Sequence, residues 1–352
     1  MSLRHICLIY LDIFTNLSYH ESANIKEAHM QLSPREHNIY IGMGGWELEP
    51  FNKYFYPPHP KKDFRKLRYY SQFFDSIEVN ATFYNTSFTS AHTRRWLDDV
   101  AANKNFMFTV KLYRGFTHTF NAKKRDLLSI YEMLDPLAGL GKLGGLIVQF
   151  PYSFTNLPER REYLRQLSKI FNQYTLFMEV RHKSWNNPMM HNFFQDIELH
   201  LVNVDLPPLK QHVPLTTLAW DGAAYFRMMG RNVRTWNNPW RMEEDGRHMV
   251  SDRYHYYYSQ HELEHLLSMI EKVFGISQST FVVFHNDPEA NSLINGFQLK
   301  HLVNQKQRVP IPQNFIRSFP KLKQISASVT RNDLLFSPID TEFGTGDLIR
   351  EQ

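Results

Sequence analysis

Apolar runs of strand length alternate with segments of helical period from about residue 39 to residue 306. The runs typical of strands begin near residues 39, 76, 106, 145, 175, 200, 223 and 280. Each of these eight runs is followed by a helical segment or by a loop long enough to contain one. Such alternation indicates parallel strands that are joined by crossover helices.

The segments between these runs carry an apolar stripe at helical spacing, with charged residues on the other side. They predict helices over 61–74, 91–100, 127–137, 159–171, 189–197, 260–273 and 293–303. Ser259 and Glu262 have the spacing of a capping box at the start of one helix, and Pro188 suits the first turn of another.

The fold class predicted from this order is α/β, as a (β/α)8 TIM-like barrel. Eight units over about 270 residues fit a closed barrel, which typically has about 250, better than an open doubly wound sheet. A dinucleotide-binding fold also lacks support, because no Gly-x-Gly-x-x-Gly follows the first strand. We expect the barrel over 39–309, an N-terminal extension over 1–38 and a loop-rich C-terminal appendage over 310–352.

The composition is that of a folded protein, and it excludes some kinds of site. The 352 residues are 42% hydrophobic and 14% aromatic, enough for a sizeable core. A net charge of +5 permits an anionic partner without requiring one. The single cysteine, Cys7, excludes an intramolecular disulfide and multi-cysteine zinc sites, and it fits a cytoplasmic location. The apolar run over 6–14 is far shorter than the roughly 20 residues of a membrane span, so no membrane association is expected.

Six of the apolar runs end in charged or amide side chains, and this recurrence predicts where the site lies. Residues two apart share one face of a strand, so the following pairs are predicted to point into the barrel. They are Glu78 with Asn80, Thr109 with Lys111, Glu179 with Arg181, Asn203 with Asp205, and Tyr225 with Arg227; Gln149 ends a sixth run. TIM barrels place their active sites at the C-terminal ends of the strands. The alternative is a buried charge network that fixes strand register.

Other candidate contacts follow from residue type at the strand ends. The segment 231–241 is rich in Arg and Trp, which suits a phosphate site after the seventh strand, with Arg231 as one contact. Trp46, Trp185 and Asn286 are further candidate contacts, and the tryptophans could equally anchor loops. His118, His182 and His285 are candidate ligands of a divalent metal, although no His-Glu-x-x-His spacing supports one.

Several of these segments resemble the YecE-like family, known as domain of unknown function 72. The segments occur in family order and lie at 78–84, 110–118, 149–151, 179–185, 225–231 and 253–259. The resemblance spans about 39–303 and implies a TIM-like barrel, without an established activity. Two positions depart from the family pattern. Met229 precedes Gly230 where a His is typical, and His285-Asn286 stands where an Asn-Asn pair is usual, so ligand contacts there would differ.

Three functions remain open from the sequence. The leading hypothesis is an enzyme that hydrolyses a phosphoester in a small phosphorylated or nucleic-acid-like substrate. In it, Glu179 is the general base or a metal ligand, with Glu78 and Asp205 as supporting carboxylates. Lys111, Arg181 and Arg227 would bind phosphate oxygens, and Asn80, Gln149 and Asn286 would orient the ligand. The alternatives are a carbohydrate-processing enzyme, with Glu78 and Glu179 beside Trp46 or Trp185, and a non-catalytic nucleic-acid or nucleotide-binding protein.

Overall fold

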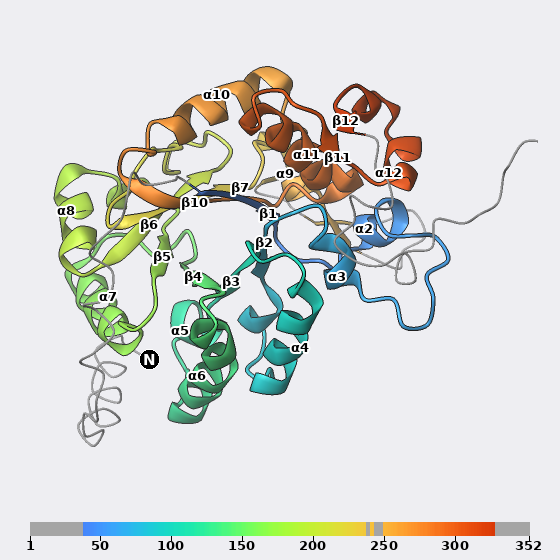
Figure 1. Ribbon diagram of the computed structural model, residues 1–352. Coiled ribbons are helices and arrows are strands. Elements are labelled where there is room, and N and C mark those ends of the chain that lie inside the picture. Colours follow the sequence, from blue (N-terminus) through green and yellow to red (C-terminus); the bar gives the residue numbers. More distant parts are fainter. Residues whose placement is uncertain (1–37, 237–239, 243–248, 328–352) are drawn as a thin grey trace, which may run out of the picture.

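The computed structural model describes residues 38–236, 240–242 and 249–327 (Figure 1). Within them, eight parallel strands close into a barrel in the order β1-β10-β7-β6-β5-β4-β3-β2. The predicted (β/α)8 barrel is therefore confirmed. The extension predicted over 1–38 lies outside the described residues except for Asn38, as does the appendage beyond Ala327.

All eight predicted strands are present at the expected places. They are β1 (Asn38–Met43), β2 (Ser76–Val79), β3 (Met107–Lys111), β4 (Leu143–Gln149), β5 (Leu176–Glu179), β6 (Leu199–Asp205), β7 (Gly222–Met228) and β10 (Ser277–Phe284). A short antiparallel pair, β8 (Trp240–Met242) and β9 (Met249–Ser251), stands outside the barrel.

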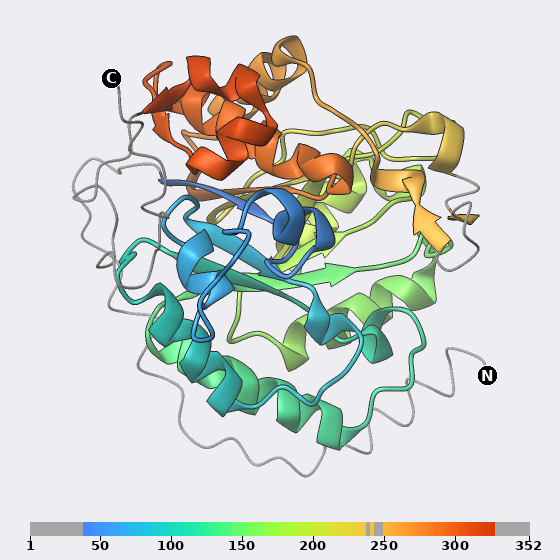
Figure 2. The same ribbon diagram turned by 90° about the vertical axis from the view of Figure 1, so that its right-hand side faces the viewer.

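The helices surround the strands, as Figures 1 and 2 show from two directions. They include α2 (Glu49–Tyr54), α3 (Lys66–Tyr70), α4 (Ser90–Val100), α5 (Arg114–Thr117), α6 (Lys124–Gly139), α7 (Pro158–Ile170), α8 (Pro188–Asp196), α9 (Val233–Trp236), α10 (Gln260–Glu271) and α11 (Asn291–Val303). The predicted capping box is present, because Ser259 Oγ accepts from the backbone N–H of Glu262, whose carboxylate accepts from Ser259 N–H.

The helix predicted over 61–74 is shorter than its apolar pattern suggests. It survives as the five residues of α3, and the chain then turns over 71–74. The side-chain amide of Asn103 donates to the carbonyls of Ser71 at 2.9 Å and Phe74 at 3.4 Å. A donor from a distant loop thus satisfies two carbonyls of the turn over 71–74, and the sequence pattern cannot show this.

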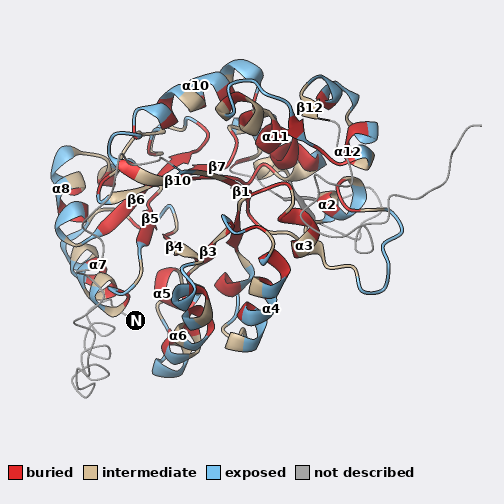
Figure 3. Cartoon of the chain, viewed as in Figure 1, coloured by how far each residue is buried: buried red, intermediate tan, exposed pale blue. Residues whose placement is uncertain are grey.

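Two apolar cores hold the barrel together. The larger lies between the strands and the helices, where buried residues line both surfaces (Figure 3). The smaller fills the barrel itself and includes Ile147, Phe177, Val202, Tyr225 and Phe281. Because large side chains occupy the lumen, it is a packed core and not a channel.

The described part of the C-terminal appendage packs beside the barrel. It contains β11 (Val309–Pro310), α12 (Gln313–Ser318), η6 (Pro320–Gln324) and β12 (Ser326–Ala327). The amide of Asn314 donates to the carbonyls of Tyr54, Phe55 and Tyr56 at 3.1, 2.9 and 3.0 Å. The Phe315 ring lies 5.9 Å from the ring of Phe55. Among the described helices, none has the length and apolar character needed to cross a bilayer.

Candidate active site

A buried arginine, Arg227, joins three strand ends at the mouth of the barrel. It comes from β7, and its side chain is 2% exposed. Its guanidinium donates to Glu78 of β2 at 2.6 and 3.1 Å and to Glu179 of β5 at 2.5 Å. It also donates to Nε2 of His285 at 3.0 Å. The strand-end residues predicted to converge on β2, β5 and β7 therefore do meet.

Both glutamates in this network are charged. Burial alone would raise the pKa of Glu78, but the charge of Arg227 outweighs it and holds the pKa below its usual range. Burial opposes ionisation of Glu179 too, yet Arg227 and Arg181 together lower its pKa to about 2. Arg181 donates to Glu179 at 2.7 Å, on the oxygen that Arg227 leaves free. Tyr225 adds a hydrogen bond of 2.9 Å to Glu78.

The prediction of which β6 side chains point into the barrel is wrong. Val202 and Val204 point into the lumen, whereas Asn203 and Asp205 point away from it. The Asn203 side chain bonds to the backbone of Leu218, at 2.9 Å as donor and 2.7 Å as acceptor. Residues on both faces of β6 are buried, so polarity did not reveal its inward face. The carboxylate of Asp205 consequently does not line the mouth.

An open cleft of about 470 Å³ lies above the Arg227 network. Its lining comprises Gly44, Asn80, Phe83, Tyr84, Lys111, Arg114, His118, Gln149, Arg181, Arg227, Met229, Tyr254, His285 and Asp287. The predicted contacts Asn80, Lys111, Gln149, Arg181 and Arg227 are thus together in one cleft. Glu78 and Glu179 are 0% exposed and lie behind its wall.

The lysine of β3 stands at the edge of this network. The ammonium of Lys111 lies 4.1 Å from the centre of the Phe83 ring. Burial lowers the pKa of Lys111 to about 7, and the charge of Arg227 adds to this effect. Since the ordinary value is 10.5, Lys111 titrates near neutral pH. Groups with such shifts in a cleft are candidates for acid–base chemistry.

Two more titratable groups line the cleft beside Lys111. Burial lowers the pKa of His118 to about 4, helped by the charges of Lys111 and Arg181. Burial raises the pKa of Asp287 to about 7, so a fraction of this carboxyl keeps its proton at neutral pH. His118 is therefore neutral at pH 7, and its ring is held by a contact of 2.9 Å between Nδ1 and Thr117 Oγ1.

Several candidate contacts predicted from the sequence lie elsewhere. Trp185 is fully buried, with its ring stacked on Phe154 at 5.6 Å. Trp46 packs against Trp96. Arg231 donates to Asp205 at 2.9 Å and to Glu262 at 3.2 Å, outside the cleft. These side chains hold loops and helices in place.

Asn286 and His182 also serve the scaffold. The amide of Asn286 donates to the Tyr256 carbonyl and to Asn295 Oδ1, both at 2.8 Å. His182 contacts Ser184 at 2.9 Å, at the start of a short 3-10 turn. Of the three candidate metal ligands, only His118 and His285 line the cleft. Among the described residues, no three His, Cys, Asp or Glu side chains are grouped so that they could hold a metal ion.

Sequence reasoning missed other cleft residues, of which Arg114, Asp287 and Gly44 matter most. Arg114 comes from the start of α5, after the end of β3, so the pattern of strand ends does not include it. A Cβ at Gly44 would lie 2.4 Å from the His285 ring, so only glycine lets that ring reach Arg227. The signal for Gly44 was its place directly after the first strand.

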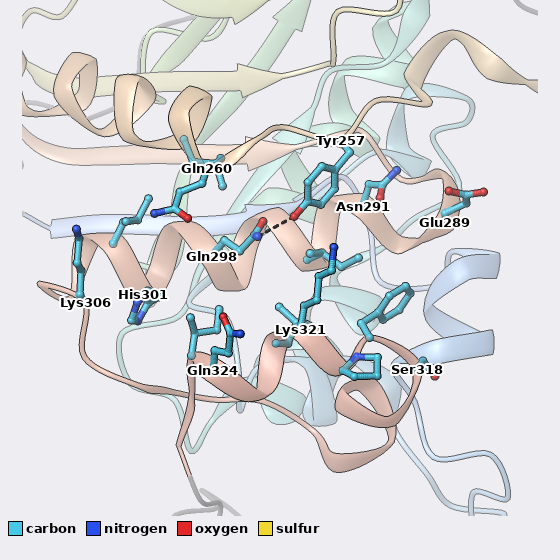
Figure 4. Close-up of a pocket in the computed structure, with 17 residues that line it drawn as sticks. Tyr257, Gln260, Glu289, Asn291, Gln298, His301, Lys306, Ser318, Lys321 and Gln324 are labelled. Atoms are coloured by element: carbon cyan, nitrogen blue, oxygen red, sulfur yellow. Dashed lines mark hydrogen bonds between the residues drawn. The ribbon is translucent and has the colours of Figure 1, made fainter.

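A larger cavity, of about 820 Å³, lies outside the barrel between α10, α11 and η6 (Figure 4). In its lining, the side-chain amide of Gln298 donates a hydrogen bond of 2.8 Å to the Tyr257 hydroxyl. Its lining lysines and glutamate, Lys306, Lys321 and Glu289, are exposed. Because the mouth cleft gathers buried charges and shifted pKa values, we take that cleft as the candidate active site.

Comparison with known proteins agrees with this fold. Residues 40–318 match the family model described as "Protein of unknown function DUF72". The chain belongs to this family. It is 28% identical over 278 residues to the UPF0759 protein YunF of Bacillus subtilis (strain 168), across 76% of this chain and 95% of YunF.

Two solved DUF72 structures extend the comparison. A family member from Thermotoga maritima MSB8 is 28% identical and superimposes with a TM-score of 0.65, over 76% of this chain and 100% of that one. A member from Enterococcus faecalis V583 is 22% identical, with a TM-score of 0.64 over 76% and 96% of the two chains, and shows the shared fold. None of these descriptions names an activity.

Proposed function

We propose that the mouth cleft is the active site of an enzyme that acts on a small phosphorylated substrate. The observation that carries this proposal is the charge of the lining. Among the described lining residues, four cations meet one carboxyl, that of Asp287; the cations are Lys111, Arg114, Arg181 and Arg227. Buried Glu78 and Glu179 balance Arg227 and Arg181, so the surplus positive charge comes from Arg114 and from the charged fraction of Lys111. A concave site with surplus positive charge concentrates anions, and guanidinium groups match the geometry of phosphate oxygens.

The reaction we propose is phosphoester hydrolysis, with Lys111 in place of Glu179 as the general base. Both Glu179 oxygens already accept from arginines, and its pKa of about 2 makes it a poor base. The neutral amine of Lys111 can take a proton from an attacking water. In this scheme Arg181 and Arg114 bind the phosphate oxygens. The water oxygen bonds to phosphorus as the bond to the alcohol oxygen breaks, and that oxygen takes the proton from Lys111 and leaves as the alcohol.

Glu78 and Glu179 have a positioning role in this scheme. They hold Arg227 and, through Glu179, Arg181 in the orientation in which both reach the cleft. We give Asp205 no part in the reaction, because its carboxylate is bound by Arg231 and by the hydroxyl of Tyr258 at 2.7 Å. Its contribution is to fix the loop after β7.

The two other hypotheses have less support. A glycosidase needs two carboxyl groups beside the substrate, but Glu78 and Glu179 share Arg227 and are inaccessible. A nucleic-acid surface would draw on Arg231, whose side chain is already paired with Asp205 and Glu262. A cleft of about 470 Å³ has the size of a small-ligand site.

Titration of inorganic phosphate at low ionic strength by calorimetry tests the binding step. Arg114 is the informative position, because it is exposed and pairs with no carboxylate among the described residues. We expect Arg114→Met to weaken phosphate binding by about tenfold or more, since a hydrogen bond to a charged group contributes about 1.5–3 kcal/mol. Arg125→Met, at an 80% exposed side chain of α6, is the matched control and should change nothing.

Turnover of p-nitrophenyl phosphate tests the reaction. We expect the unaltered chain to hydrolyse it and Lys111→Met to lose that activity while still binding inorganic phosphate. Phosphate binding that Arg114→Met leaves unchanged, or the absence of binding, would contradict the proposed site.

A further inference from the structure

Lys111 has the surroundings of a nucleophile as well as of a base. Its ammonium packs on the face of Phe83, and no carboxylate of the described residues lies within ion-pair distance of it. Lys300 shows the ordinary arrangement, with its ammonium 3.1 Å from Asp75. An unpaired, partly buried lysine beside other cations is the arrangement that activates an amine towards carbonyl carbon.

We propose that Lys111 forms a Schiff base with the carbonyl group of a small phosphorylated aldehyde or ketone, whose phosphate is bound by Arg114 and Arg181. This inference uses the phosphate-binding part of the proposed function and not its hydrolytic step. It names a substrate class, a phosphorylated carbonyl compound. It also explains why the amine lies inside the cleft, at the end of β3, rather than on its rim.

The charges around Lys111 come from three strands, β2, β5 and β7, and two arginines there balance two glutamates. Burial and the charge of Arg227 lower the pKa of Lys111, Glu78 and Glu179 raise it, and Arg181 lowers it further. With a pKa of about 7, roughly half of this amine is uncharged at pH 7, against about one in several thousand for a lysine at the usual 10.5. Only the uncharged amine attacks a carbonyl.

The reaction conserves atoms and charge without an oxidant or reductant. The Lys111 nitrogen bonds to the carbonyl carbon, the π electrons move to oxygen, and a proton passes from nitrogen to that oxygen. The carbon–oxygen bond of this carbinolamine then breaks as the nitrogen lone pair forms the C=N bond. Asp287 lines the same cleft and supplies the proton with which the hydroxyl leaves as water.

Reductive trapping tests the inference on the full chain. The protein is incubated with glycolaldehyde phosphate and sodium cyanoborohydride, and the adduct is located by peptide mass mapping. We expect a reduced adduct at Lys111, formed at least about tenfold faster than at Lys300, because the Lys300 ammonium is held by Asp75 at 3.1 Å. The rate should rise as pH increases through about 7, because the amine loses its proton there.

Two comparisons distinguish a failure of the Schiff-base proposal from a failure of the proposed phosphate site. Glycolaldehyde without phosphate should label Lys111 at least about tenfold more slowly, and inorganic phosphate should slow the phosphorylated probe. Equal rates for the two aldehydes would overturn the phosphorylated substrate class. If Lys111 remains unlabelled while calorimetry still shows phosphate binding, the Schiff base is excluded and the proposed phosphate site stands. Because labelling is mapped in the unaltered chain, the test does not depend on the folding of a Lys111→Met variant.

Discussion

Replacement of Arg227 by methionine tests the physical role of the charged network. The substitution removes the arginine that bonds to Glu78 at 2.6 and 3.1 Å, while Glu179 keeps Arg181 at 2.7 Å. His285 remains, with Nε2 at 3.3 Å from Glu78. Both carboxylates remain fully buried. Breaking a buried ion pair by removing one partner costs about 3–5 kcal/mol, because an uncompensated charge is left inside. We expect Arg227→Met to lose about that much unfolding free energy at pH 7, a large part of the usual 5–15 kcal/mol.

The pH dependence of this loss identifies its cause. In the unaltered chain both glutamate pKa values lie below the ordinary 4.5, so their stabilisation is present above that pH and is lost as pH falls towards 2. Without Arg227, the possible cation left beside Glu78 among the described residues is His285, and burial of the unpaired carboxylate raises the pKa of Glu78 or of His285. The folded variant then takes up a proton that the unfolded chain does not. The variant should therefore gain stability between pH 7 and 5, and the difference from the unaltered chain should shrink.

Urea unfolding at pH 7 and pH 5, followed by circular dichroism, measures both effects. Adding Glu78→Gln to Arg227→Met should recover part of the lost stability, since it removes the unpaired charge. Arg125→Met is the control for losing an exposed arginine and should stay within about 0.5 kcal/mol. A loss below about 1 kcal/mol, or one that is the same at both pH values, would refute the reasoning.

Two further predictions concern residues that we assign to the scaffold. Trp185→Ala should cost about 3–5 kcal/mol in urea unfolding, because the indole is fully buried and donates to the Phe154 carbonyl at 2.7 Å. Its phosphate affinity, measured by calorimetry, should stay within about twofold, and a loss beyond tenfold would return Trp185 to the site. Asn314→Ala should lower unfolding free energy by about 1–3 kcal/mol, since three carbonyls lose their donor. An unchanged unfolding midpoint would mean that the segment after residue 309 adds little to the barrel.

Much of the site could be predicted because strand alternation has a strict period of two. Glu78, Lys111, Glu179 and Arg227 each lie at an inward position whose neighbours along the strand are apolar, and the structure brings them to one mouth. β6 shows the limit of this reasoning. Its Asn203 points outward, where the backbone of Leu218 in a later loop pairs with the side-chain amide. A polar residue in this strand therefore does not indicate an inward position.

The sequence by itself determined the eight strands, their parallel closure and the placing of the chemistry at their C-terminal ends, since hydrophobic periodicity and chain order are local properties. The tertiary structure alone decided how the charges pair. Coulomb energy depends on distances between side chains that are far apart in the sequence, such as Glu78 and Arg227, separated by 149 positions. That pairing withdraws two carboxylates behind the cleft wall and leaves Lys111 beside the arginines, with an amine that titrates near neutral pH.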